Sequence, residues 1–217
     1  ARMAVERHEW KRAADLTPRT PQYLPWDESP WAEGLTRFAR GLGAAQMGDI
    51  QAAGEAERHL GKLRDRAKAA DNEHMAAYIE IDRRVLAGRI AYAQEEPEKA
   101  VELTRSAAEL ETTVEKHPVT PGALLPPYEA VGDLLMDLDR PAEALEAYEA
   151  SDAIWPGRYN TLIGAARAAR EAGDERTARK HYERLLAKTG DSKRATVKEA
   201  DAFLETKKGV GAVDRTP

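Results

Sequence analysis

The sequence predicts an all-α protein built from antiparallel helix pairs. Three observations predict it: small residues recur at fixed offsets, glycine and proline turn signals separate the recurring segments, and alanine and glutamate are abundant between those signals. Small residues are needed where two helices cross at an interaxial distance of about 8–10 Å. Self-similarity at a period of about 34 residues is typical of stacked helix pairs.

The clearest repeat lies in the second half of the chain, where matched residues stand 34 positions apart. The matched residues are Gly132 and Ala166, Ala144 and Ala178, and Tyr148 and Tyr182, in the copies 125–158 and 159–192. Two weaker copies keep a twelve-residue separation between their small residues. They are 81–114, with Gly88 and Ala100, and 34–67, with Gly41 and Ala53. The extra residues between copies therefore fall outside the predicted helical cores.

This pattern resembles the tetratricopeptide repeat, including copies found in bacterial proteins. The best copy fills the repeat's aromatic, aliphatic, small and terminating positions with Tyr128, Val131, Gly132, Leu135, Ala144, Tyr148 and Pro156. The resemblance implies a right-handed superhelical solenoid of about four helix pairs over residues 31–192. It also implies that the first helices line a concave groove that binds a peptide or protein segment.

Turn signals mark the helix ends independently of the repeat. Gly-Asp at 48–49 and at 173–174 places a helix stop next to an N-cap residue. Pro97 and Pro141 stand where proline is tolerated, in the first turn of the second helix. The glycines of GLGAAQ, residues 41–46, lie inside a predicted helix, so we expect them to serve packing rather than phosphate binding.

The two ends of the chain are expected to differ from the array. Residues 1–30 predict part of a preceding helix, over 5–16, followed by a proline-rich connector. In that connector Tyr23, Leu24 and Trp26 either pin the segment across the first helix pair or belong to a loosely attached linker. Residues 193–206 predict a capping helix with Val197, Ala200, Phe203 and Leu204 on one face, and residues 207–217 predict a frayed tail.

The stretch EKHPVTPGALLPP, residues 115–127, interrupts the array between two copies. Pro118 ends the preceding helix, and Pro126 and Pro127 suit the start of the next one. The insertion is either a spacer between repeats or a binding loop in which His117 and Thr120 supply polar contacts. The sequence leaves both interpretations open.

Helical geometry relative to the small residues predicts which side chains face the groove. These groove residues are Asp82, Arg89, Tyr92, Glu129, Asp133, Asp137, Asn160, Arg167 and Arg170. The predicted groove is acidic over 129–137 and basic at 167 and 170, which favours a ligand of mixed charge. Family members that clamp a carboxyl-terminal chaperone tail use lysine and asparagine at sites that here hold Asp133 and Ile163, so that specificity is not expected.

Composition and motifs argue against several other functions. The net charge of −5 disfavours nucleic acid as the partner, and no apolar run approaches the length of a membrane span. The chain has no cysteine, and HEWKR at 8–12 has arginine where the zinc-binding HExxH motif requires its second histidine. We expect no enzyme activity, no cofactor and no metal site.

The sequence therefore favours a protein-interaction scaffold whose partner is a protein or peptide. Two alternatives stay open: a small-molecule or metal sensor that uses the 115–127 loop, and a regulatory fragment of a larger enzyme. An uncovered N-terminal edge would favour a homodimer through that edge. Because the chain begins with neither an initiator Met nor a signal peptide, we expect a fragment of a longer protein, and the compartment, cytoplasmic or periplasmic, depends on the missing N-terminus.

Overall fold

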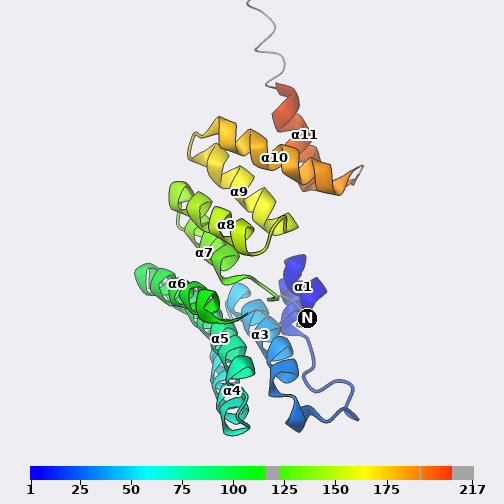
Figure 1. Ribbon diagram of the computed structural model, residues 1–217, viewed down its shortest axis with the longest axis vertical. Coiled ribbons are helices and arrows are strands. Elements are labelled where there is room, and N and C mark those ends of the chain that lie inside the picture. Colours follow the sequence, from blue (N-terminus) through cyan, green and yellow to red (C-terminus); the bar gives the residue numbers. More distant parts are fainter. Residues whose placement is uncertain (116–122, 191, 207–217) are drawn as a thin grey trace, which may run out of the picture. The chain divides into compact units, whose positions relative to one another are not determined.

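A computed structural model describes residues 1–115, 123–190 and 192–206, and these are helical without any strand (Figure 1). The chain divides into two compact units, Ala1–Leu134 and Leu135–Pro217. Of the 115–127 insertion, the structure describes residue 115 and residues 123–127. His117 and Thr120 lie outside the described residues, as does the predicted tail.

The first unit contains two short N-terminal helices, a 3-10 turn and four long helices. Their bounds are α1 Arg2–Glu6, α2 Trp10–Ala14, η1 Trp26–Glu28, α3 Pro30–Gln46, α4 Ile50–Ala69, α5 Glu73–Ala93 and α6 Pro97–Thr113. Helix α7, Pro127–Asp137, begins in this unit and ends in the second. The second unit continues with α8 Pro141–Ile154, α9 Tyr159–Glu171, α10 Glu175–Thr189 and α11 Ala195–Thr206.

The turn signals act where the sequence predicts. Gly48 and Gly173 both adopt φ of +80°, a left-handed conformation that glycine takes without a steric penalty. Asp49 and Asp174 follow as N-caps, accepting hydrogen bonds from the backbone of Ala52 (2.9 Å) and Thr177 (3.0 Å). Prolines begin α3, α6, α7 and α8. The predicted helix boundaries are therefore confirmed at these turns.

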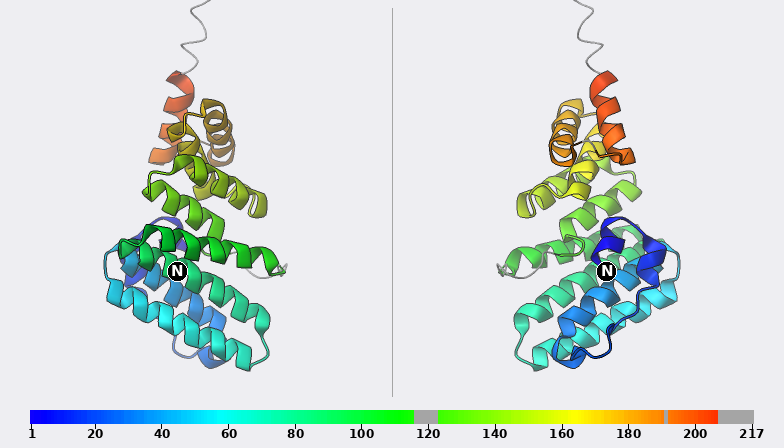
Figure 2. Two further views of the ribbon diagram at one scale, coloured as in Figure 1. Left: turned by 90° about the vertical axis from the view of Figure 1, so that its left-hand side faces the viewer. Right: turned by 90° about the vertical axis from the view of Figure 1, so that its right-hand side faces the viewer.

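Helices that follow one another in the sequence pack side by side in each unit. In the first unit α3 packs on α4, α4 on α5 and α5 on α6, and α3 also contacts α5 (Figure 2). In the second unit α9 packs on α8 and on α10, and α10 packs on α11. The contact of α3 with α5 brings together two predicted first helices, as stacked pairs require.

Small residues stand at the closest helix crossings. A Cβ built on Gly88 would overlap the Thr104 hydroxyl and lie 2.9 Å from the carbonyl oxygen of Ala100. A Cβ on Gly41 would collide with Leu86 and lie 3.0 Å from the Ala56 Cβ. The prediction that glycines inside the helical copies serve packing is thus confirmed at both positions.

The predicted N-terminal helical element is two short helices rather than one. Helix α1 ends at Glu6 and α2 begins at Trp10, and His8 between them adopts φ of +54°. Ala4, Val5 and Ala13 are buried, and α2 packs against α3 (Figure 2). The break at His8 lets both short helices turn an apolar side towards the rest of the unit.

The connector is held by charged groups, and the pinning role predicted for two of its residues is wrong. Tyr23 is 85% exposed and Leu24 is 42% exposed, so neither anchors the segment. Arg19 instead pairs with Glu33 of α3 (2.9 Å), and Arg66 of α4 donates to the carbonyl oxygen of Asp27 (2.8 Å). The spacing of apolar residues in the connector does not predict these polar contacts.

The helix predicted over 193–206 is present as α11. Val197 and Ala200 are buried, and Phe203 and Leu204 pack against the core of α9 and α10. Ala200 lies 34 residues after Ala166, so α11 continues the spacing of the first helices. The ring centroids of Phe203 and Tyr182 lie 4.8 Å apart.

Candidate functional site

Two predicted groove residues of α5 interact with each other. The guanidinium of Arg89 lies over the Tyr92 ring, 5.3 Å from its centroid. With the side-chain oxygen of Gln46 turned towards Arg89, that oxygen accepts hydrogen bonds of 3.1 and 2.9 Å from Nε and Nη2. Arg89 is therefore held between α3 and its own helix.

Arg89 also lines a narrow crevice together with the groove residue Asp133 of α7. Leu42 of α3, Val85 of α5 and the half-buried Trp10 of α2 line the same crevice. The remaining volume is about 20 Å³, which is room for about one water molecule. Here the chain's own tryptophan lies beside two residues that the sequence predicts to face a groove.

Two other predicted groove residues of the first unit have almost no exposed surface. Asp82 is 7% exposed and Glu129 is 1% exposed, so neither offers a carboxylate to a ligand. Burial, together with the nearby carboxylate of Glu111, raises the pKa of Asp82 to about 8. The sequence predicts that both carboxylates are exposed, because they are polar. That prediction is wrong, because both residues are packed against neighbouring helices.

In the second unit, the two groove arginines of α9 bind a carboxylate from α11. Arg167 donates to both oxygens of Glu199, with the shortest distance 2.6 Å, and Arg170 donates to Glu199 Oε1 at 3.4 Å. The Tyr182 hydroxyl donates to the same oxygen at 2.8 Å. Burial of Glu199 would raise its pKa, but the hydrogen bonds from Arg167 and Tyr182 outweigh that effect and lower it.

The remaining predicted groove residues, Asn160 and Asp137, stand near helix ends. Asn160 is half-buried near the beginning of α9, and Asp137 is exposed at the end of α7. The acidic group that the sequence predicts in a ligand for Arg167 and Arg170 is thus supplied within the second unit by its last helix. An external ligand at these arginines would have to compete with Glu199.

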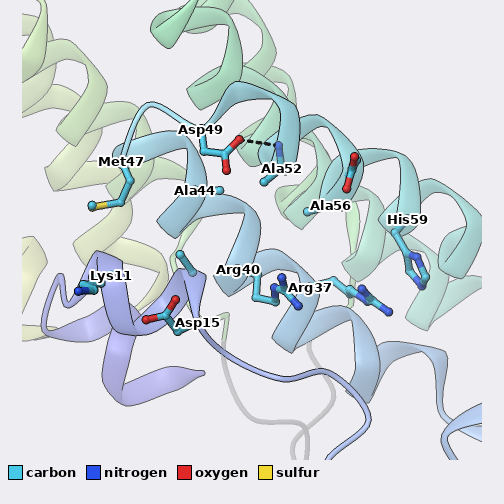
Figure 3. Close-up of a pocket in the computed structure, with 12 residues that line it drawn as sticks. Lys11, Asp15, Arg37, Arg40, Ala44, Met47, Asp49, Ala52, Ala56 and His59 are labelled. Atoms are coloured by element: carbon cyan, nitrogen blue, oxygen red, sulfur yellow. Dashed lines mark hydrogen bonds between the residues drawn. The ribbon is translucent and has the colours of Figure 1, made fainter.

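The first unit also contains an open cleft that sequence reasoning did not predict (Figure 3). Its volume is about 480 Å³, within the range of small-ligand pockets. Figure 3 shows Lys11 and Asp15 at the border formed by α2, Arg37 and Arg40 along α3, and His59 on α4. The alanines Ala44, Ala52 and Ala56 line the cleft between these charged residues.

A buried carboxylate organises one end of this cleft. Glu33 is fully buried and accepts hydrogen bonds from Arg19 (2.9 Å), Arg37 (3.0 Å) and His59 (3.0 Å). Burial would raise the pKa of Glu33, but the two arginines outweigh it and lower that pKa. The pKa of His59 is lowered by burial and by the positive charge of Arg37.

The position of α2 is the main feature that sequence reasoning missed. One signal was present: Gly43 in GLGAAQ is a second glycine within one helical turn, and the structure places it under the α2 backbone. No comparable signal marks Glu33, because a glutamate in the first turn of a helix is ordinarily solvated. Its burial depends on Arg19 and His59, which are distant in sequence.

Within the described ranges, no three histidine, aspartate or glutamate side chains are grouped so that they could hold a metal ion. Among the same residues, no helix combines the length and apolar character that crossing a bilayer requires. Comparison of the chain with protein-family models, with curated proteins and with solved structures returned no match.

Proposed function

We propose that this chain is a non-catalytic interaction scaffold, a tetratricopeptide-like right-handed solenoid whose first-helix faces bind a helical segment of a partner protein. The 34-residue spacing and the small residues at the helix crossings support the architecture. The pairing of consecutive helices and the contact of α3 with α5 support it further.

One observation carries the binding proposal. In each unit, residues predicted to face the groove are already in contact with a short helix from elsewhere in the chain. In the first unit Trp10 of α2 lines the same crevice as Arg89, and in the second unit Glu199 of α11 binds Arg167 and Arg170. These faces therefore have the shape and the charge to accept a helix.

Site-specific photocrosslinking tests this proposal. A benzophenone amino acid at position 92 replaces Tyr92 with a similar aromatic ring on the proposed groove face. The matched control carries the same group at Glu102, which is exposed on α6. We expect a partner to be crosslinked from position 92 and not from 102, and then to bind the purified chain directly. Equal crosslinking from both positions, or none from either, would refute groove binding.

A second candidate function, a small-molecule sensor, is favoured by the cleft of about 480 Å³ rather than by the 115–127 loop. Lys11, Arg37 and Arg40 line it together with Asp15 and Glu55, so a small zwitterion such as a dipeptide has complementary chemistry. A set of dipeptides should then raise the melting temperature of the wild type in a saturable way. Loss of that effect in an Arg40→Ala variant would support the sensor, and its absence in the wild type would exclude it.

A further inference from the structure

We propose that the crevice of the first unit is specific for a short amphipathic helix with a tryptophan and a small residue three positions later. In the free chain, α2 occupies this seat in cis, with Trp10 and Ala13 as the two anchors. The inference rests on the proposed function, because it names the chemistry of the partner helix that the groove accepts. It adds that the partner must displace α2.

The first part of the seat is a backbone contact at Gly43. A Cβ at this position would lie 2.5 Å from the carbonyl oxygen of Trp10 and 2.5 Å from the backbone nitrogen of Ala14. It would also lie 3.0 Å from the Cβ of Ala13, which is fully buried. At this contact between α2 and α3, only glycine fits at position 43 of α3 and only a small residue fits at position 13 of α2.

The second part of the seat is the crevice that receives Trp10. Its lining residues include Leu42 on α3, Val85 and Arg89 on α5 and Asp133 on α7, which are predicted first helices, and also Thr104 on α6 and Leu125 before α7. The volume left beside the indole is about 20 Å³. An indole supplies a large apolar area at the cost of two side-chain torsions, which is why tryptophan commonly anchors binding segments.

The polar side chains of α2 do not tie it to the seat. The ion pairs of Arg7 and Arg12 are both made to Glu9, inside the same segment. Lys11 and Arg12 are exposed, whereas Ala13 is buried. Since the seat recognises one indole and one close backbone approach, another helix with the same two features can replace α2.

The length of α2 makes such replacement accessible. A helix of five residues is not stable in isolation, so α2 owes its helical state to the seat. The helix is bounded by the turn at His8 and by its own end at Ala14. A partner helix of the same length would likewise become ordered on binding.

A peptide of residues 5–16, VERHEWKRAADL, labelled with fluorescein, is the direct probe. We would titrate it by fluorescence anisotropy with the whole wild-type chain and with the whole chain carrying Trp10→Ala. We expect saturable binding to the variant, with a dissociation constant at least about tenfold lower than for the wild type, where α2 holds the seat in most molecules. The same peptide with alanine in place of tryptophan should not bind.

No saturable binding to the Trp10→Ala chain, or equal binding of the peptide without tryptophan, would overturn the proposal. A second variant, Gly43→Ala, keeps the test independent of the folding of Trp10→Ala. It should release α2, so trypsin should cleave after Lys11 and Arg12 several times faster than in the wild type. The matched control is Gly61→Ala, another helical glycine, whose added Cβ would lie 3.8 Å from its nearest neighbour. Equal cleavage of the two variants would also overturn the proposal.

The results separate this inference from the broader function. If crosslinking at position 92 succeeds and the peptide fails, the groove binds a partner of different chemistry and the tryptophan rule is wrong. If the peptide binds and no partner is crosslinked, the seat exists, but the scaffold proposal loses its support.

Discussion

Gly88→Ala tests the packing on which the repeat interpretation depends. An added Cβ would overlap the Thr104 hydroxyl, lie 2.9 Å from the Ala100 carbonyl oxygen and lie 3.3 Å from the Thr104 Cβ. Ala100 and Thr104 are both buried on α6, so α5 and α6 can accommodate the methyl group only by separating. Overpacking of this kind costs about 1–3 kcal/mol.

The helix itself gains from the same substitution. Alanine is favoured over glycine inside a helix by about 1 kcal/mol, so the net loss in the free energy of unfolding should be about 0–2 kcal/mol. Gly61→Ala provides the matched comparison, because its Cβ would make only an ordinary contact with Arg83 and should stabilise the chain by up to about 1 kcal/mol. The two variants should therefore differ by about 2 kcal/mol.

Urea unfolding followed by tryptophan fluorescence is the suitable assay. Trp10, Trp26 and Trp31 lie in the first unit and only Trp155 lies in the second, so the signal reports mainly on the unit that carries Gly88. The double variant Gly88→Ala/Thr104→Ala should recover part of the loss, because it removes the overlapping hydroxyl. A Gly88→Ala chain that unfolds at the same urea concentration as Gly61→Ala, or at a higher one, would refute the close crossing of α5 and α6.

Three carboxylates, Asp82, Glu80 and Glu199, give further predictions. Urea unfolding tests the first two, and hydrogen exchange tests the third. Burial raises the pKa of Asp82 to about 8, so the free energy of unfolding should fall by up to about 1.4 kcal/mol per pH unit as pH rises between about 4 and 8. The Asp82→Asn variant should lack this dependence on pH. If the variant keeps it, Asp82 ionises normally. Burial opposes ionisation of Glu80, but three arginines outweigh it and lower its pKa to about 2, so its stabilisation is present above pH about 4.5 and is lost towards pH 2. Glu80→Gln should cost about 1–3 kcal/mol at pH 7 and much less near pH 2, and a cost independent of pH would contradict the ion-pair origin. Glu199→Gln removes the acceptor of two arginines and a tyrosine, so amide hydrogen exchange in α11 should accelerate severalfold, whereas Glu205→Gln, an exposed site on the same helix, should leave it unchanged.

Much of the helical arrangement could be predicted because the signals that define it are local. A glycine with positive φ followed by an aspartate N-cap specifies a helix end within four residues, as at Gly48 and Asp49. The spacing of Gly88 from Ala100 specifies which positions of consecutive helices cross. The apolar face of α11 was readable in the same way, from Val197 and Ala200.

The candidate site was less predictable, because it depends on which surface each segment reaches. Helical geometry places Asp82 and Arg167 at corresponding faces, yet the first is buried beside Glu111 and the second is paired with Glu199. Partners of this kind come from another helix, and their side chains meet only after the helices have packed. The apolar spacing of residues 5–16 likewise predicts helix without saying where that helix lies.

The sequence by itself determined that the chain is helical, where helices end and begin at the Gly-Asp turns and at several prolines, and which small residues mark their crossings. Capping, turn conformation and the spacing of small residues act within one helix pair, so a linear pattern contains them. Only the tertiary structure decided that α2 would lie on Gly43 with Trp10 in the crevice, that Glu199 would reach the arginines of α9, and that Glu33 would be buried among three cationic or polar partners. Those arrangements depend on close contacts between residues far apart in sequence, and their free energy depends on burial and orientation that no local pattern records.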